Sequence, residues 1–478
     1  MKKTGLWVMG ICLTGASVFA QQAEIKAAQH ALGEKDYKTA QVHIDRAGAL
    51  LVQNRSRMKD DIVASYYYTK GNVYMGIADS APGLSTGADP VVIGAKAYIR
   101  LRDFESGKSH QAKNSATGNW TYFDSESDMK SAMASGNYKK TRVRNRTAKY
   151  TPQLGTALQQ RLTSLDKATR DAYETKDFQK ASGDYVALYY LNDAASGEKR
   201  PIYLYYAAIT AAQGKDFKTA AKHYQNLLRM GYTGMGKRYT LMNTKTGKRE
   251  PVSSKKVGEL MEKTDAYTDL KAEQLPNKQP EIYRFAAYSY EQLGDTAQAL
   301  ALLKKGVSAF PHDKNLMGDL GSLYAQRGDM DSYITILRKW VADDPNNAQL
   351  CCDMGRALYR KGDHQAAEKY YRKAIALKPD MGDAYFYLAV VELAPESEII
   401  AQVNELGNSK ADNAAYKSLQ KKRSALYKSV VPLLEQARKY NASRKRVVLQ
   451  TLKKIYADQS MDAKYEEVQA ALKALDNQ

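Results

Sequence analysis

Residues 293–296 read Leu-Gly-Asp-Thr, residues 327–330 read Arg-Gly-Asp-Met, and residues 361–364 read Lys-Gly-Asp-His. The Gly-Asp pair recurs at an interval of 34 residues, and the prolines at positions 311, 345 and 379 keep the same interval. Thirty-four residues is the length of a helix-turn-helix unit, which cannot bury its apolar face alone and therefore stacks on copies of itself. The interval predicts an all-α fold, a helical solenoid that presents a binding surface.

Three consecutive units, 280–313, 314–347 and 348–381, carry similar residues at matching positions. Position 8 holds Ala287, Gly321 and Gly355, and position 11 holds Tyr290, Tyr324 and Leu358. In the second helix, position 20 holds Ala299, Tyr333 and Ala367, and position 24 holds Leu303, Leu337 and Tyr371. Small residues at positions 8 and 20 let the two helices of a unit approach closely, and the proline stops the second helix. The pattern resembles the tetratricopeptide repeat (TPR) family, which implies an α-α superhelix that binds proteins and brings no known activity.

Similar units are expected on both sides of this block. The turn sequence Lys-Asp-aromatic at residues 35–37, 176–178 and 215–217 indicates units at 21–54, 162–195 and 201–234. A degenerate unit is expected between them, and others after the central block. The helices of the degenerate unit are predicted at 61–77 and 90–104. After the central block, a further unit is expected to begin with a helix at Gly382 and to have its second helix displaced to 424–440. Two last helices, at 446–458 and 462–475, are expected to cap the array.

Two insertions interrupt the repeats. Residues 105–150 are rich in Ser, Gly, Asn and Lys and end in the basic run 139–149, so we expect a mostly irregular segment. In the second insertion, two short extended runs flank a turn at Gly247 and predict a β-hairpin within 238–252. This piece resembles one found between the repeat blocks of exported TPR proteins of Gram-negative bacteria.

The expected division of the chain follows from these features. It comprises a signal peptide (1–20), N-terminal TPR-like units (21–104), a polar and basic insertion (105–150), TPR units (151–234), the hairpin insertion (235–279), three consecutive TPR units (280–381), and divergent units with capping helices (382–478).

The N-terminus has the order of a cleaved secretory signal. Lys2 and Lys3 precede an apolar run at 6–13, and Val18-Phe19-Ala20 forms a cleavage site before Gln21. We therefore expect an exported, periplasmic protein, with envelope association or secretion as alternatives. Neither this run nor any later one approaches the roughly 20 apolar residues of a membrane span, so an integral membrane protein is not expected. A lipid anchor on Cys12 is a further alternative, although Ile11 stands where that signal has a small residue.

The composition is strongly basic, with 72 Lys and Arg against 52 Asp and Glu and a formal net charge of +20. Such a charge favours acidic partners or anionic surfaces. Nucleic acid is not an expected partner of an exported protein. The alternative to a protein-binding groove is therefore an anionic envelope polymer or membrane surface, bound through the basic runs 139–149, 237–256, 421–423 and 444–446.

No pattern of residues indicates an enzyme, a metal site or a cofactor. The six histidines are scattered, and neither HExxH nor GxSxG occurs. Residues 231–238 approach a P-loop, but Arg238 replaces the Mg²⁺-binding Ser or Thr and a helix precedes the segment. Cys351 and Cys352 are adjacent on a helix and cannot form a disulfide; Cys351 occupies a packing position, and Cys352 is expected to be more exposed.

The inner surface of the solenoid is the candidate binding site, because positions 2, 5, 9, 12 and 13 of each first helix project away from the second helix. Gly318 and Ala325 leave space there between flanking Arg and Tyr residues. An extended peptide is predicted to lie in this groove, with a hydrated face lacking a ligand as the alternative. The candidate groove residues are Arg284, Tyr288, Asn315, Ser322, Arg356, Tyr359 and Arg360.

The carboxylate clamp of chaperone-binding TPR proteins is not reproduced, because Tyr288, Asp319, Gln349 and Asp353 occupy several of its positions. Recognition of a C-terminal acidic tail is therefore not expected. The leading hypothesis is a non-enzymatic, exported adaptor that binds extended peptide segments of protein partners in the bacterial cell envelope.

Overall fold

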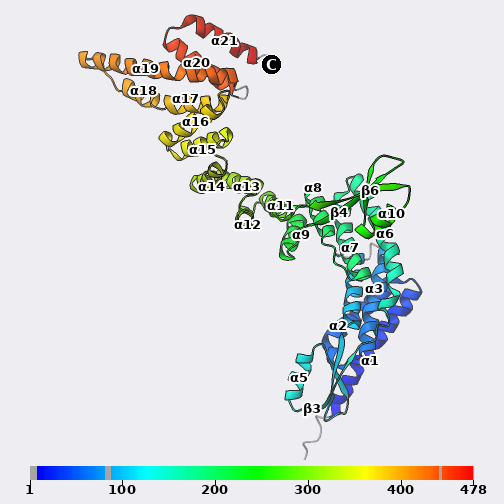
Figure 1. Cartoon of the computed structure of the whole chain (residues 1–478). Helices are drawn as coiled ribbons and strands as arrows, with labels where there is room; N and C mark the ends of the chain where they lie inside the picture. Colours follow the sequence, from blue (N-terminus) through cyan, green and yellow to red (C-terminus); the bar gives the residue numbers. More distant parts are fainter. Residues whose placement is uncertain (1–7, 81–87, 441–443, 477–478) are drawn as a thin grey trace, which may run out of the picture. The chain divides into compact units, whose positions relative to one another are not determined.

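The computed structural model describes residues 8–80, 88–440 and 444–476. The chain divides into two compact units, the first ending at Leu302 and the second beginning at Leu303 (Figure 1). Helices make up 71% of the structure, and within the described ranges the β-strands form two small antiparallel sheets in the first unit. The predicted all-α solenoid with a small β insertion is confirmed.

The first unit is built from helices that pack on their neighbours in sequence. They are α1 (Val8–Gly33), α2 (Tyr37–Asn54), α3 (Asp60–Ser80), α4 (Pro90–Glu105), α6 (Gly155–Glu174), α7 (Phe178–Ser196), α8 (Ile202–Gln213), α9 (Phe217–Arg229) and α11 (Gln279–Gln292), with a 3₁₀ turn, η1 (Arg55–Arg57), between α2 and α3. A further helix, α12 (Thr296–Ala309), contains the boundary between the units. Small residues such as Ala28, Ala40 and Ala208 are fully buried and permit close helix packing.

One turn explains both repeated sequence signatures. In the Gly-Asp units, Gly294, Gly328 and Gly362 have φ angles of +79°, +74° and +90°, which glycine adopts without steric cost. The lysines of the Lys-Asp units, at 35, 176 and 215, take the same left-handed conformation, with φ of +60° to +62°. The following Asp then accepts a hydrogen bond from the third backbone N–H of the next helix, for example Asp36 from Thr39 and Asp363 from Ala366. A left-handed residue followed by an Asp N-cap is therefore the common device that ends one helix and starts the next.

Residues 105–150 are not mostly irregular, which corrects the expectation from composition. They form a three-stranded antiparallel sheet with strand order β2-β1-β3 and a helix. Its elements are β1 (Lys108–Asn114), β2 (Trp120–Phe123), α5 (Glu126–Ala134) and β3 (Tyr138–Asn145). The apolar alternation of an ordinary strand is missing because polar residues fill the sheet interior. Ser109 and Gln111 are fully buried on β1, where Gln111 donates to Ser109 and accepts from Arg142.

The second insertion contains the predicted hairpin, formed by β4 (Gly236–Asn243) and β5 (Arg249–Val252). The structure adds a helix, α10 (Lys255–Met261), and a third strand, β6 (Tyr267–Leu275), which pairs with β4. The strand order β5-β4-β6 is that of the first insertion. We call residues 108–145 the first sheet module and residues 236–275 the second sheet module.

The sequences of the two modules align without a gap at an offset of 129 residues. Asn114 and Asn243 stand at this offset, and each side chain accepts hydrogen bonds from the second and third following backbone N–H groups. Gly118 and Gly247 both have a positive φ in the same turn. The matching serines at 125 and 254 cap α5 and α10. The two insertions are therefore the same structural module.

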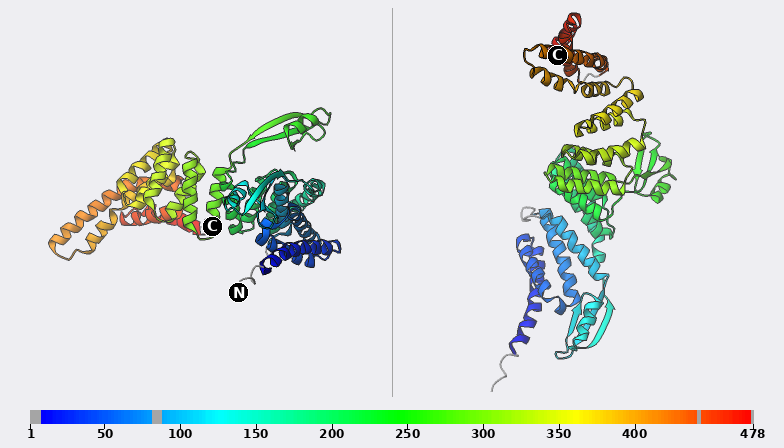
Figure 2. Two further views of the ribbon diagram at one scale, coloured as in Figure 1. Left: turned by 90° about the horizontal axis from the view of Figure 1, so that it is seen from below. Right: turned by 90° about the vertical axis from the view of Figure 1, so that its left-hand side faces the viewer.

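The modules differ in how they meet the helices of the first unit. The first sheet module packs on them: β2 lies against η1, and Arg146 and Asp124 of the insertion form ion pairs with Asp60 and Arg55. The second sheet module makes its contacts chiefly within itself and projects from the helices, as the left view of Figure 2 shows. Two cross-strand ion pairs, Arg238–Glu273 and Arg249–Asp269, lie on its exposed surface.

The first module is also tied to the end of α4 by a buried carboxylate. Glu105 is 3% exposed, and its carboxylate accepts hydrogen bonds from the backbone N–H groups of Lys149, Tyr150 and Thr151. A buried charge is tolerated only when it is hydrogen-bonded in this way. Glu105 thereby fixes the chain where the insertion returns to the helices.

The second unit continues as stacked helices. They are α13 (Lys314–Gln326), α14 (Met330–Asp343), α15 (Ala348–Lys361), α16 (His364–Leu377), α17 (Gly382–Leu393), α18 (Glu396–Asn404), α19 (Lys410–Tyr440), α20 (Lys445–Asp458) and α21 (Asp462–Asp476). Ala367 and Tyr371 are fully buried in its core. A Cβ atom added to Gly355 would lie 2.6 Å from the Tyr371 ring, which explains the small residue at position 8 of this repeat.

Two features at the end of the second unit differ from expectation. The helix expected at 424–440 is the second half of the much longer α19, which packs against α17, and α18 precedes it. The long helix forms because residues 410–423 contain no Gly or Pro and are mostly good helix formers. Within the described residues, no helix combines the length and apolarity needed to cross a membrane.

Candidate functional site

The candidate groove residues lie in both units. Arg284 and Tyr288 belong to α11 of the first unit, whereas the remaining five lie on α13 and α15 of the second. Tyr288 is 50% exposed and meets Phe217 edge-on, with ring centroids 5.9 Å apart. Arg284 is half-buried. Most of the candidates therefore lie within the second unit.

On α13 and α15 the candidates differ in accessibility. Asn315, Ser322 and Arg360 are exposed, as a ligand-binding face requires. Arg356, in contrast, is already engaged, because it pairs with Asp353 and its guanidinium lies 5.8 Å from the ring centroid of Tyr387 on α17. Partial burial would lower the pKa of Arg356, but Asp353 and Tyr387 raise it above its ordinary value. Arg356 therefore connects two repeats.

Cys352 is not exposed, which corrects the expectation from its repeat position. Its exposed fraction is 1%, and burial raises the pKa of its thiol to about 12. The neighbouring Cys351 is also buried and free. Both thiols pack as small apolar groups between α15 and its neighbours, because a neutral thiol in an apolar interior is favoured over a thiolate.

A second guanidinium reaches Tyr387 from the C-terminal helices. Arg444, the residue before α20, donates from Nη2 to the Tyr387 hydroxyl at 2.5 Å, and its Nε lies 3.5 Å from Asp383 Oδ1. Its guanidinium also lies over the rings of Phe386 and Tyr387, at 5.3 and 4.8 Å from their centroids. The basic run 444–446 predicted a charged surface patch, and only the fold shows that Arg444 contacts the inner helix α17.

A pocket of about 490 Å³ adjoins these residues. The candidate Tyr359 lines it, together with Phe386, Val390 and Leu393 of α17. It is also lined by Ile400 of α18 and by Val447, Thr451 and Lys454 of α20. Much of the lining is apolar, and its polar residues include Glu396 and Lys454. A pocket of this composition can accommodate an apolar group beside a few polar contacts.

Glu396, which lines this pocket, connects the surrounding helices. Its carboxylate accepts hydrogen bonds from Arg423 on α19, from Lys454 on α20 and from the hydroxyl of Tyr427. Arg423 also pairs with Asp458 at the end of α20. The network connects α18, α19 and α20 beside the pocket.

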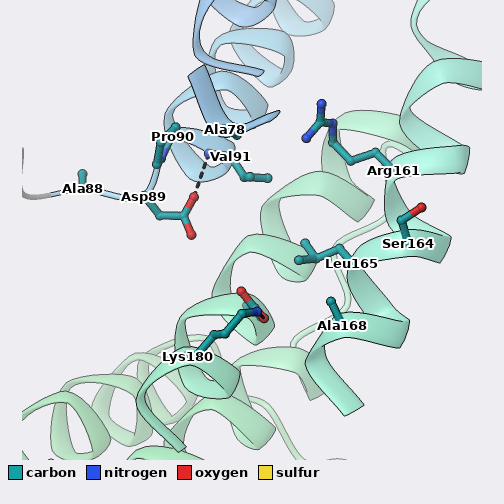
Figure 3. Close-up of a pocket in the computed structure, with 11 residues that line it drawn as sticks. Ala78, Ala88, Asp89, Pro90, Val91, Arg161, Ser164, Leu165, Ala168 and Lys180 are labelled. Atoms are coloured by element: carbon teal, nitrogen blue, oxygen red, sulfur yellow. Dashed lines mark hydrogen bonds and ion pairs between the residues drawn. The ribbon is translucent and has the colours of Figure 1, made fainter. Parts of the chain in front are cut away.

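The first unit has a separate pocket of about 650 Å³ between α4, α6 and α7 (Figure 3). Its charged side chains serve the fold: Asp89 caps α4, Arg161 pairs with Asp79, and Lys180 pairs with Asp184. Burial raises the pKa of Asp184, and Lys180 opposes this shift. Ala78, Leu165 and Ala168 form much of the remaining lining. We interpret this pocket as a packing gap between repeats rather than as the principal site.

Catalytic groupings are not apparent in the parts of the chain that the structure describes. No three His, Cys, Asp or Glu side chains gather there in a way that could hold a metal ion. Residues 231–238 form the connection from α9 into β4, and the preceding element is a helix instead of the strand of a P-loop.

Comparison with known sequences identifies the repeats. Tetratricopeptide repeat models match residues 291–350 and 352–394, so this part of the chain consists of tetratricopeptide repeats. No curated protein matches the sequence. Tetratricopeptide repeats generally act as scaffolds for protein–protein interaction.

Solved structures of several TPR proteins resemble the chain. The C-terminal part of a TPR protein from Cytophaga hutchinsonii is 12% identical, with a TM-score of 0.39 over 65% of this chain and 95% of that chain. MamA of AMB-1 is 14% identical, with a TM-score of 0.29 over 51% and 93%. YrrB, a TPR protein with an unusual peptide-binding site, is 16% identical, with a TM-score of 0.28 over 45% and 86%. These likenesses are too low to carry a functional argument.

Proposed function

We propose that this protein is an exported, non-enzymatic scaffold of the bacterial cell envelope that binds an extended peptide segment of a protein partner in the second unit. The scaffold role follows from its tetratricopeptide repeats. Export is supported by the order of Lys2, Lys3, the apolar run 6–13 and the small residue Ala20. Peptide binding is supported by the pocket between α15, α17, α18 and α20.

The juxtaposition of this pocket with two guanidinium groups carries the proposal. Phe386 lines the pocket on one side and lies beneath Arg444 on the other. Tyr359 lines the pocket one helical turn after Arg356. An apolar peptide side chain in the pocket would thus place a neighbouring carboxylate within reach of Arg356 or Arg444, whose side chains are 39% and 36% exposed.

A charge placed in the pocket tests the proposal. Val447 lines the pocket and is 48% exposed, so Val447→Glu adds a carboxylate to its wall with little effect on the fold. Leu377→Glu is the matched control, because Leu377 is 37% exposed at the end of α16 and does not line the pocket. The partner is first captured from envelope extract, and its bound segment is then titrated as a labelled peptide.

We expect Val447→Glu to weaken binding by about tenfold or more, since burying an unpaired carboxylate against an apolar wall is unfavourable. Leu377→Glu should bind as the unaltered protein does. Equal affinities of the two variants would exclude the pocket as the peptide site.

Binding to an anionic envelope polymer or membrane surface is the second candidate function. Lys139, Lys140, Arg142 and Arg144 are exposed along β3, an edge strand of the first sheet module. Charge-driven binding through this strand would weaken steeply with ionic strength, whereas binding in the apolar pocket would weaken less. Cosedimentation with anionic vesicles at low and high salt distinguishes the two functions.

A further inference from the structure

A second concentration of arginine lies in the first unit, where the first sheet module meets the helices. A pocket of about 600 Å³ opens there. Arg55 and Arg100 reach it from η1 and α4, and Arg146 reaches it from the chain that follows β3. Tyr67 and Phe104 supply aromatic walls. Three guanidinium groups around one cavity are unusual, because like charges repel and each buried one requires a counter-charge.

The aromatic ring of Phe104 supports two of these groups. The guanidinium carbon of Arg146 lies 3.9 Å from the ring centroid of Phe104, and that of Arg55 lies 5.3 Å from it. Arg146 also donates from Nη1 to the Phe104 carbonyl oxygen at 3.3 Å. Stacking on a ring fixes the plane of a guanidinium and directs its remaining N–H groups, which is the arrangement that recognises a planar oxyanion.

Several donors in this cluster have no hydrogen-bond acceptor among the described residues. These are the buried Nη1 and Nη2 of Arg55 and the Nε of Arg146. Arg55 Nη2 lies 2.7 Å from Asp124 Oδ1, and Arg146 Nε lies 3.2 Å from Asp60 Oδ1, but neither ion pair has hydrogen-bond geometry. Asp60 Oδ1, which faces Arg146 Nε, is likewise without a hydrogen bond, so these two groups can satisfy one another. Because buried donors are almost always satisfied in folded proteins, the donors left for an added acceptor are those of Arg55.

The two carboxylates that pair with Arg146 and Arg55 differ in exposure. Asp60 is 15% exposed beside Arg146, whereas Asp124, the counter-ion of Arg55, is 65% exposed. Arg100 is exposed and is the third cation that lines the pocket, which is also lined by the carboxylate of Asp103. Burial lowers the pKa of Arg146, Asp60 opposes this shift, and the nearby positive charge of Arg55 adds to it. An added anion would relieve this repulsion.

The second sheet module provides an internal comparison. At the offset of 129 residues, Ser253 stands in place of Asp124 and Leu275 in place of Arg146. That module makes its contacts chiefly within itself. The charges of Asp124 and Arg146 are therefore specific to the first module and are not a general property of this fold.

We propose that the Arg55–Arg100–Arg146 pocket binds an oxyanion, that is, a carboxylate, sulfate or phosphate group, carried on an apolar or aromatic body. The anionic group lies between Arg55 and Arg100, where it replaces the exposed carboxylate of Asp124 as the acceptor. The body of the ligand lies against Tyr67 and Phe104. This site belongs to the first unit and is separate from the peptide pocket of the second unit.

Arg100→Gln tests the site, because Arg100 lines the pocket from an exposed position on α4 and forms none of the ion pairs that hold the first module. Arg57→Gln is the matched control, since Arg57 is exposed on η1 and does not line the pocket. Binding of sulfate, inorganic phosphate and phenylacetate to the whole protein is measured by isothermal titration calorimetry. Phenylacetate distinguishes an anion with an aromatic body from a bare inorganic anion.

We expect saturable binding at one site, with phenylacetate binding more tightly than sulfate or phosphate. Arg100→Gln should weaken it by about tenfold, as loss of one charge-assisted contact does, while Arg57→Gln has no effect. Asp124→Asn, which removes the internal competitor, should strengthen binding. Absence of saturable binding to all three anions, or equal binding by the Arg100 and Arg57 variants, would overturn the proposal. Neither result affects the peptide pocket.

Discussion

Arg423 donates from both Nε and Nη2 to one carboxylate oxygen of Glu396, over distances of 3.2 and 2.9 Å. Glu396 is 7% exposed, and Lys454 and Tyr427 donate to the same oxygen. One carboxylate thus joins α18, α19 and α20 behind the pocket of the second unit. The stability of the C-terminal helices and the shape of the candidate site therefore depend on a single buried charge.

Removing this charge should destabilise the second unit. Glu396→Gln leaves Lys454 and Arg423 without their shared counter-charge, which should cost about 3 kcal/mol. Glu398→Gln, at an exposed position on the same helix, should change stability by less than about 0.5 kcal/mol. Urea unfolding followed by circular dichroism measures both variants, and equal midpoints would contradict a stabilising role for Glu396.

The same carboxylate should make stability depend on pH. Burial alone would raise the pKa of Glu396, but hydrogen bonds from Tyr427, Arg423 and Lys454 lower it below its ordinary value of 4.5. A pKa that is lower in the folded state stabilises the fold above the unfolded-state pKa, and this contribution is lost as pH falls through the folded-state pKa. The difference in unfolding free energy between the unaltered protein and Glu396→Gln should therefore shrink below about pH 4.5. A difference that stays constant down to pH 3 would contradict this assignment.

The core of the repeat block can be tested at Ala367. This residue is fully buried on α16, so Ala367→Arg forces a long charged side chain into a close helix contact. Overpacking and the unpaired charge together should cost about 3 kcal/mol or more. Lys369→Ala, at an exposed position on the same helix, should leave the melting temperature nearly unchanged. Thermal melting compares them, and similar melting temperatures would show that the repeat register is wrong.

The groove arginines should affect binding and stability differently. Arg360→Glu changes an exposed residue and should weaken peptide binding by about 2 kcal/mol if Arg360 contacts the peptide. Arg356→Glu should also lower the melting temperature, because it sets a new carboxylate beside Asp353 and removes the contact with Tyr387. The Arg356→Glu, Arg360→Glu double variant should combine both effects.

Lys373→Glu serves as the charge-reversal control for this pair, because Lys373 is exposed on α16 and is not a groove residue. Peptide titration and thermal melting are measured for each variant. If Lys373→Glu weakens binding as much as Arg360→Glu does, net charge rather than the groove determines affinity.

Export predicts a defined mature N-terminus. Cleavage after Ala20 leaves Gln21 as the first residue, because the charged start, the apolar run and the small residue stand in processing order. Gln21 is fully buried and donates to the carbonyl oxygen of Ala47, so the chain remains tied to α2 from this point. The cleavage site is tested by intact mass measurement and N-terminal sequencing of protein from the envelope fraction. A mature chain that begins with lipid-modified Cys12 would show that the cleavage assignment is wrong.

Part of the candidate site was accessible from the sequence. The repeat register placed Tyr359 and Arg360 on the inner helix α15, because one period of 34 residues determines which helix faces are equivalent. The register did not reveal that Phe386, Val447 and Lys454 line the same pocket, since α18 and the long α19 lie between α17 and α20 in the chain and break the period. The first sheet module was missed because its strands bury Ser109 and Gln111 instead of apolar residues. The repeated Asn-x-x-Thr-Gly turn at 114–118 and 243–247 was the signal that could have shown both modules.

The helical solenoid, the turn that joins its helices and the hairpin of the second insertion could be predicted from the sequence. These features depend on local rules, namely apolar periodicity, a left-handed residue before an Asp cap, and a glycine in a tight turn. Which polar side chains are buried, and with what partners, became clear only from the fold, as for Glu105, Glu396 and Arg146. Burial and ion pairing depend on residues distant in the chain, and both the peptide pocket and the arginine pocket are made of such contacts.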